Sequence, residues 1–327
     1  MELPSLNQIR TAQEVVYRYM PPTPQYSWPL VNERLGCEAW LKHENHTPVG
    51  AFKLRGSLVY VKWLKESQPE LRGVVAATRG NFGQGVAMAA RLFGLKPVIV
   101  VPHGNSVEKN RAIAAQGAEL IEHGHDFQAS LEYARTLAEE RGFAFVESFH
   151  EQLVAGTATY ALEFFESAPP LDVVYVPIGL GSSICGMAAA RAALGLTTEI
   201  VGVVAERSPS YALSFKAGRV VEAPAETAIA DGMACRRPNE QALKTILEHV
   251  ARIVEVSEDE IKSAMCACFQ DTHNLVEGAG AAGLAAATRE RDALRGRRVG
   301  TVLTGANVDM ETCAAVLGTA RECVRAN

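Results

Sequence analysis

The sequence predicts an α/β protein with parallel sheets. Short runs rich in β-branched residues alternate with alanine-rich stretches of helical length, and no fixed-period repeat interrupts them. Strands that alternate with helices of about 10–15 residues are typical of βαβ units, in which helices cover both faces of the sheet. Such sheets bind ligands at the carboxyl ends of their strands, so the chemistry is expected at the strand-to-helix junctions.

The first half of the alternation spans residues 74–141. Its expected elements are a strand at Val74–Thr78, a helix at Phe82–Phe93, a strand at Pro97–Val101, a helix at Val107–Gln116, a strand at Ala118–Glu122 and a helix at Phe127–Arg141. Gly117 and Gly142 follow the last two helices, and glycine commonly ends a helix.

The second half begins at residue 173. Its expected elements are a strand at Val173–Ile178, a helix at Ser183–Leu194, and strands at Ile200–Ala205, Ile253–Val256 and Val299–Leu303. Ser257 and Glu260 have the spacing of a capping box. A helix is therefore expected directly after the strand at 253–256.

The composition is that of a globular chain without a basic surface. Of the 327 residues, 48% are hydrophobic and 21% charged, and the net charge is −5. This length allows two or three domains. Nucleic acids and anionic membranes attract concentrated positive charge, so neither is expected as a partner. The first residues, MELPSLNQIR, lack a secretory signal, and the seven cysteines are scattered. Reduced thiols and a cytoplasmic location are therefore expected.

Two strand-to-helix junctions carry glycine-rich loops, at residues 78–85 (TRGNFGQG) and 177–183 (PIGLGSS). Converging backbone N–H groups at a helix N-terminus suit a phosphate. The second loop lacks the P-loop lysine, because Met187 follows Gly186, and the dinucleotide pattern fails at Ile184. A cradle for a single phosphate fits. A turn that only lets helix and sheet pack closely remains the alternative.

One lysine, Lys53, lies between Phe52 and Leu54 in the segment HTPVGAFKLRG. Burial would lower the pKa of this lysine and make it nucleophilic, which suits a Schiff base with a carbonyl compound. A lone lysine is far more often a solvated surface residue, so its position alone does not assign a function.

Five motifs follow one another along the chain. They are GAFKLRG, TRGNFGQG, the glycine and serine loop after residue 177, IADG at 229–232, and LTGANV at 303–308. In this order and spacing the sequence resembles the threonine dehydratase and serine racemase family of fold-type-II pyridoxal-phosphate enzymes, from Pro22 to Val316. The resemblance implies pyridoxal 5′-phosphate as the cofactor, a small amino acid as the substrate and a homodimer.

The same resemblance implies a tryptophan synthase β-like α/β fold. Its large domain would comprise residues 1–69 and 150–327 and contain a parallel or mixed sheet. Its smaller α/β domain would comprise residues 70–149 and carry the substrate loop.

The resemblance also assigns cofactor-binding residues. Lys53 matches the lysine that forms the Schiff base and later removes the Cα proton. The other matches are Phe52 beside the cofactor ring, Asn81 at its phenolic oxygen, Glu277 near the ring, Thr304 at the pyridine nitrogen, and the phosphate loop Gly179, Leu180, Gly181, Ser182 and Ser183. A neutral Thr304 at that nitrogen weakens the electron sink and favours β-elimination over transamination.

The substrate loop matches the family except at one position. Thr78, Arg79, Gly80 and the backbone of Asn81 match the loop that holds the substrate carboxylate. Many relatives have Ser or Ala where this chain has Arg79, and His where it has Phe82. A guanidinium is a poor proton shuttle, because its pKa is above about 12, so racemisation is disfavoured. Arg79 either pairs with a second substrate carboxylate, or it points outward or bonds to a neighbouring helix end.

A metal site is not predicted, although some relatives bind a divalent cation. Glu206 matches one of their ligands, but Ala212 stands where the second acidic residue is expected. His43 and His46 lie near Lys53 without nearby acidic residues or cysteine, and a structural role is expected for them.

Three hypotheses of function follow. The first is a pyridoxal-phosphate lyase that eliminates the hydroxyl of a β-hydroxy amino acid, with L-threonine or L-serine as the default substrate and 3-hydroxyaspartate or 3-phenylserine as alternatives. The second is a serine or other amino-acid racemase. The third is a non-catalytic small-molecule-binding protein on the same scaffold, which would have no need of a Schiff-base lysine.

Overall fold

The chain folds around two β-sheets, and the computed structural model describes residues 1–325. The strands of the larger sheet are β1 (Gln25–Ser27), β2 (Glu38–Lys42), β7 (Val173–Pro177), β8 (Glu199–Ala205), β9 (Arg252–Val256) and β10 (Arg298–Val302). Their order is β1-β2-β10-β7-β8-β9. Only β1 pairs antiparallel in this sheet, so the sheet is mixed.

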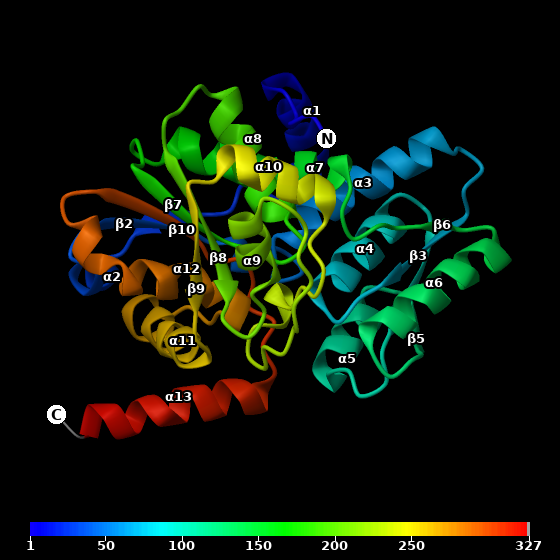
Figure 1. The fold of residues 1–327 in the computed structure, drawn as a ribbon. Coiled ribbons are helices and arrows are strands. Elements are labelled where there is room, and N and C mark those ends of the chain that lie inside the picture. Colours follow the sequence, from blue (N-terminus) through cyan, green and yellow to red (C-terminus); the bar gives the residue numbers. More distant parts are fainter. Residues whose placement is uncertain (326–327) are drawn as a thin grey trace.

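The smaller sheet is wholly parallel. Its strands are β3 (Gly73–Ala77), β4 (Lys96–Val101), β5 (Glu119–Glu122) and β6 (Ala144–Phe145), in the order β5-β4-β3-β6. Figure 1 shows this sheet to the right of the larger one. All four strands lie within residues 70–149, the segment that we propose to be the smaller domain. The fold class predicted from the sequence is confirmed.

Helices cover both faces of each sheet. They are α1 (Leu6–Val16), α2 (Pro29–Leu35), α3 (Lys53–Ser67), α4 (Asn81–Leu92), α5 (Val107–Ala115), α6 (Phe127–Arg141), α7 (Glu151–Ser167), α8 (Ser182–Ala193), α9 (Ser210–Ala217), α10 (Glu240–His249), α11 (Glu258–Thr272), α12 (Gly278–Arg289) and α13 (Met310–Arg325). Three short 3₁₀ helices are η1 (Glu44–His46), η2 (Asp231–Met233) and η3 (Arg291–Leu294). Both faces of a parallel sheet are buried in this way, which explains the continuous apolar strands.

The apolar core is divided by the sheets. On one face of the larger sheet α1, α7, α8 and α10 pack together, and on the other α2, α11 and α12 do so. In the smaller sheet α4 packs with α3 on one face, and α6 covers the other. Helix α3 also packs against α7, so it lies between the two sheets.

The strands and helices predicted from the alternation are all confirmed, with boundaries that differ by at most one residue. The capping box is present, because Glu260 N donates to Ser257 Oγ at 3.2 Å and Ser257 N donates to Glu260 Oε2 at 2.8 Å. Gly117 and Gly142 have φ angles of 85° and 64°, a left-handed conformation that favours glycine. Strands β1, β2 and β6 were not predicted from the sequence.

Two further features bear on the sequence-based expectations. Within residues 1–325 no helix combines the length and the apolar character needed to cross a bilayer. The side chains of residues 1–318 are described, and the six cysteines among them form no disulfide; Cys323 lies beyond these residues.

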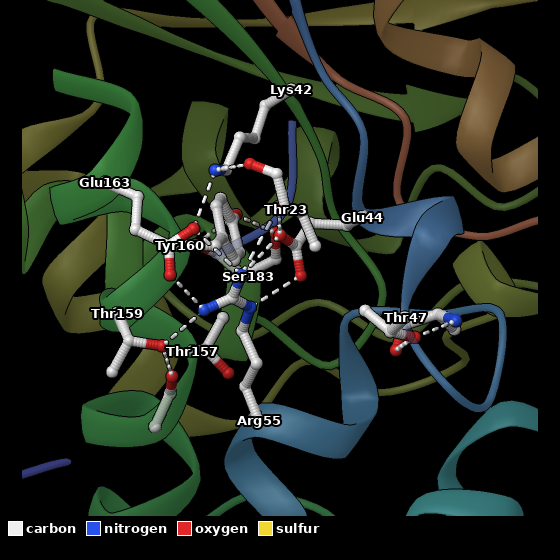
Figure 2. A network of polar contacts seen from close by, with 12 residues as sticks. Thr23, Lys42, Glu44, Thr47, Arg55, Thr157, Thr159, Tyr160, Glu163 and Ser183 are labelled. Carbon is white, nitrogen blue, oxygen red and sulfur yellow. Dashed lines mark hydrogen bonds and ion pairs between the residues drawn. The ribbon is translucent and has the colours of Figure 1, made fainter. Parts of the chain in front are cut away.

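A buried ionic cluster joins α3 to the larger sheet (Figure 2). Arg55 is fully buried on α3 and donates from Nε to Glu44 Oε2 at 2.7 Å and from Nη1 to Glu163 Oε1 at 2.6 Å. Lys42 Nζ donates to Glu163 Oε2 at 2.7 Å and to Thr23 O at 2.8 Å. Two cations face two anions, so the charges cancel. The cluster thereby links β2, η1, α3 and α7.

Breaking this cluster is expected to destabilise the fold strongly. Replacing Arg55 by Met leaves two carboxylates buried without their guanidinium partner, and such a loss typically costs about 3–5 kcal/mol. The matched control is Arg10→Met, which removes an exposed ion pair with Glu166 and should cost less than about 1 kcal/mol. Urea unfolding measures both. Equal losses in the two variants would contradict the prediction.

Candidate active site

A cavity of about 140 Å³ lies where the carboxyl ends of β3, β7 and β10 approach the start of α3. Every residue that the sequence predicts for the site lines this cavity. They are Phe52, Lys53, Thr78, Arg79, Gly80, Asn81, Gly179, Leu180, Gly181, Ser182, Ser183, Glu277 and Thr304. The roles of these residues remain predictions, but their convergence from five separate segments brings the predicted chemistry into one place.

Lys53 is the first residue of α3. The two residues before it form backbone contacts with the segment that follows β10. Phe52 N donates to Thr304 O at 3.1 Å, and Ala51 pairs with Gly305 as an isolated bridge. The Nζ atom lies 4.6 Å from the centroid of the Phe52 ring. Burial lowers the pKa of Lys53 to about 8, although the nearby Glu277 carboxylate opposes this shift. The amine is therefore much more nucleophilic near neutral pH than an ordinary lysine.

The loop after β7 forms a cradle for an anion. A Cβ atom at position 179 would lie 2.3 Å from Gly232 O, and Gly181 has a φ angle of 105°, so both positions require glycine. The first hydrogen bond of α8 runs from Cys185 N to Gly181 O at 3.0 Å. The N–H groups at the start of α8 are thus free to bind a ligand. Within residues 1–325, the Ser182 side chain also makes no hydrogen bond, which fits a phosphate.

Asn81 and Glu277 meet on the wall of the cavity. Asn307 Nδ2 donates to Val49 O at 2.8 Å and to Asn81 Oδ1 at 2.7 Å. A carbonyl oxygen can only accept, so this chain of bonds directs Asn81 Nδ2 to Glu277 Oε1, at 2.7 Å. Burial raises the pKa of Glu277 to about 7, while Lys109 and the Asn81 bond oppose the shift. Asn307 was quoted within a motif but was not predicted as a site residue.

The loop after β3 is shaped by Thr78. Its Oγ1 accepts from Gly80 N at 3.1 Å and from Gly83 N at 3.3 Å. The Thr78 hydroxyl proton stays available to a ligand. Arg79 follows as an exposed residue that lines the cavity. Its guanidinium makes no hydrogen bond or ion pair, to backbone or side chain, in the described part of the molecule, so a bond to a neighbouring helix end is not found.

Sequence reasoning missed an ion pair across the cavity. Lys109 on α5 donates from Nζ to Asp231 Oδ2 on η2 at 2.8 Å, and both residues line the cavity. A Cβ atom at Gly80 would lie 3.1 Å from Lys109 Cδ. A larger residue at position 80 would therefore crowd the methylene groups of the Lys109 side chain. The IADG motif pointed to Asp231, but no local signal pointed to Lys109. The other lining residues without a predicted role are Phe82, Pro177, Gly232, Met233 and Ala279.

Residues considered for a metal do not assemble into a site. Among the residues described, no group of three or more His, Cys, Asp or Glu side chains is placed to hold an ion. Glu206 is exposed. His43 is buried, accepts a hydrogen bond from Trp28 Nε1 at 3.2 Å and packs with its ring 5.0 Å from that of His46. Burial lowers the pKa of His43 to about 4, which is consistent with the structural role expected from the sequence.

The features of the cavity together indicate the kind of cofactor that it binds. A nucleophilic amine, a cradle of backbone N–H groups and a neutral hydroxyl at Thr304 surround one cavity. The Thr304 side chain, like that of Ser182, makes no hydrogen bond within residues 1–325. Such a site fits a phosphorylated aldehyde that is held covalently by lysine, which is how pyridoxal phosphate is bound.

Comparison with known proteins also points to pyridoxal phosphate. The family described as "Pyridoxal-phosphate dependent enzyme" matches residues 16–305. An L-threonine ammonia-lyase of Thermotoga maritima is 33% identical over 94% of this chain and 76% of its own length. An L-threo-3-hydroxyaspartate ammonia-lyase of Saccharomyces cerevisiae is 32% identical over 97% of each chain. The structure of maize serine racemase superposes with a TM-score of 0.90 at 27% identity, covering 99% of this chain and 100% of the racemase.

The chain therefore belongs to the pyridoxal-phosphate dependent enzymes of fold type II, in the group that contains the threonine dehydratases and serine racemases. Pyridoxal phosphate is accordingly its cofactor. The family identified from five motifs in the sequence is confirmed.

The pKa of Lys53 can be checked by covalent labelling. The full chain stripped of cofactor is treated with pyridoxal phosphate and borohydride over a range of pH, and the labelled peptide is quantified. Because only the free amine attacks, labelling of Lys53 should rise with pH with a midpoint near 8, whereas an ordinary lysine titrates near 10.5. Lys53→Arg is the control and should lose this labelled peptide. A midpoint near 10.5 would contradict the burial argument.

Proposed function

We propose that the protein catalyses β-elimination of a β-hydroxy amino acid, giving a 2-oxo acid and ammonia, with L-threonine or L-serine as the default substrate. The observation that carries this proposal is Lys53, whose amine has a pKa of about 8 and lies in the same cavity as the anion cradle and the neutral Thr304. The two ammonia-lyase relatives support the reaction class.

The residues of the cavity divide the binding task. Gly179 to Ser183 would hold the cofactor phosphate, and Phe52, Asn81 and Thr304 would hold its ring. When bound, the cofactor withdraws electrons from the substrate Cα–H bond. Thr304 carries no charge with which to strengthen this withdrawal, which favours loss of a β-substituent. The backbone at Gly80 and Asn81, with the Thr78 hydroxyl, would hold the substrate carboxylate.

Lys53 would act as the base. Its amine, once free, takes the proton from the substrate Cα, because its lowered pKa keeps a useful fraction unprotonated near neutral pH. The β-hydroxyl takes up a proton and leaves as water, so the elimination as a whole moves one proton from Cα to the leaving oxygen. Hydrolysis of the resulting enamine then consumes one water and releases ammonia. The products are ammonia and a 2-oxo acid that lacks the β-hydroxyl, and no oxidant or reductant is needed.

Arg79 favours a second candidate substrate. An exposed guanidinium that lines the cavity and pairs with no described side chain is suited to a distal carboxylate. L-threo-3-hydroxyaspartate carries such a group, and one relative is named for acting on it. The alternative of racemisation has support from the likeness to maize serine racemase. It lacks support at residue 79, because a guanidinium does not release or accept a proton near neutral pH.

We also propose a cytoplasmic homodimer. Leu30 on α2 and Phe269 on α11 are large apolar side chains that are exposed to solvent, and α2 packs against α11. Exposed apolar residues on adjoining elements are typical of a protein interface. Light scattering of the purified protein measures the assembly, and a monomeric mass would overturn this part of the proposal.

A substrate panel tests the reaction. Release of 2-oxo acid and ammonia is measured with added cofactor for L- and D-serine, L- and D-threonine, the 3-hydroxyaspartate isomers and 3-phenylserine. We expect activity with at least one L-β-hydroxy amino acid and its loss by more than a thousandfold in Lys53→Ala, since the other amine of the cavity, that of Lys109, is held in an ion pair with Asp231. Interconversion of L- and D-serine without oxo-acid release would instead favour a racemase.

Variants at Arg79 test the substrate preference. If the guanidinium pairs with a distal carboxylate, Arg79→Ala should lower kcat/KM for 3-hydroxyaspartate by about tenfold or more, the loss expected for one charge-assisted hydrogen bond. The same variant should change kcat/KM for L-threonine by less than about threefold. Arg79→Lys should restore part of the lost activity. Equal losses for both substrates would refute the distal-carboxylate assignment.

A further inference from the structure

Two buried tyrosines support the phosphate loop from outside the cavity. Tyr160 on α7 and Tyr211 on α9 are fully buried, and neither lines the cavity. Tyr160 Oη lies 2.7 Å from Ser183 Oγ and 3.4 Å from Ser183 O (Figure 2). Tyr211 Oη donates to Leu180 O at 2.9 Å. The two phenols therefore reach the two ends of the segment that forms the anion cradle.

Each phenol is held in its neutral form. Burial raises the pKa of both tyrosines above the ordinary value of 10, so their O–H groups keep their protons at any working pH. Tyr160 has no hydrogen-bond partner other than Ser183 in residues 1–325. A buried hydroxyl without a partner is costly. The Ser183 side chain is therefore constrained to stay where Tyr160 can reach it.

These two bonds determine which way the loop presents its donors. Either hydroxyl can donate in the Tyr160–Ser183 pair; in the arrangement in which Tyr160 donates, the hydroxyl proton of Ser183 remains free for an anion. When Tyr211 donates to Leu180 O, the Gly181 N–H of the same trans peptide points the opposite way, away from α9. Both bonds thus leave donors of the loop unused by the protein.

The position of Tyr160 also relates the loop to Lys53. Its ring packs edge-on against Phe52, with ring centroids 6.2 Å apart. Helix α7 carries Tyr160 one turn before Glu163, the residue that binds Arg55 of α3. One helix therefore holds both the start of α3 and the start of α8.

We propose that Tyr160 and Tyr211 are positioning residues for the phosphate of the cofactor, acting through Ser183 and through the Leu180–Gly181 peptide. The proposal rests on the family's cofactor and not on the proposed reaction. It predicts that each hydroxyl contributes to the binding of the phosphate group alone. The competing explanation is that these tyrosines only fill the core.

Binding of two forms of the cofactor distinguishes these explanations. The full chain stripped of cofactor is titrated with pyridoxal phosphate and with pyridoxal, which carries the same aldehyde and ring but no phosphate, and absorbance reports the Schiff base with Lys53. Tyr160→Phe should weaken binding of pyridoxal phosphate about fivefold, the loss expected for one hydrogen bond. Binding of pyridoxal should change by less than about twofold. Tyr211→Phe should show the same selectivity.

A control and a double variant complete the test. Tyr175→Phe removes the hydroxyl of another fully buried tyrosine, which bonds to Glu290 outside the cavity, and should leave both affinities unchanged. Ser183→Ala combined with Tyr160→Phe should lose no more affinity than the larger single loss, because the two groups act through one bond. Equal weakening of pyridoxal and pyridoxal phosphate, or an unchanged affinity for pyridoxal phosphate, would overturn the proposal. Neither measurement depends on turnover, so an inactive substrate panel would not affect it.

Discussion

The pairing of Arg55 with two buried glutamates is the constraint on which the site depends. In a low-dielectric interior neither a guanidinium nor a carboxylate is tolerated alone, so the cluster forms only when all of its members arrive together. Glu44 comes from η1 and Glu163 from α7, more than a hundred residues apart in the sequence. Because Arg55 lies two residues after Lys53, satisfying its charge also fixes the beginning of α3. The reactive lysine is therefore placed by an electrostatic requirement that the reaction itself does not use.

Inside the cavity the same burial acts on two groups in opposite senses. It lowers the pKa of Lys53 and raises that of Glu277, so both lie close to neutrality. Neither group is therefore held firmly in its charged form near neutral pH. The anion cradle has no cation among Gly179 to Ser183, and it relies on neutral donors of fixed direction.

Much of the fold could be predicted from the sequence, because strand and helix periodicity are local. The helices after β3 and β7 begin within a residue or two of their expected starts, and the glycine loops were found from the same alternation. Strand β1 could not be predicted in this way, since its three residues form the antiparallel edge of the sheet. Lys53 and the two glycine-rich loops could be singled out from local patterns, but the roles of the site residues were assigned only through the resemblance to the family. Lys109 was missed because its partner, Asp231, lies far away in the sequence and no local pattern encodes a long-range ion pair.

The order of strands in the larger sheet has a consequence for biosynthesis. Strand β10 is the last strand of the chain, yet it lies between β2 and β7, and Arg298 pairs with Glu38 across some 260 residues. During translation β2 and β7 emerge first, and the position between them in the sheet stays empty until β10 has been synthesised. Contacts of such high sequence separation form slowly and leave apolar edges exposed in the meantime. The carbonyl that accepts the hydrogen bond from Phe52 N belongs to Thr304, which follows β10. The segment that carries Lys53 therefore gains this contact only late in synthesis, and so does the ability of the chain to bind its cofactor.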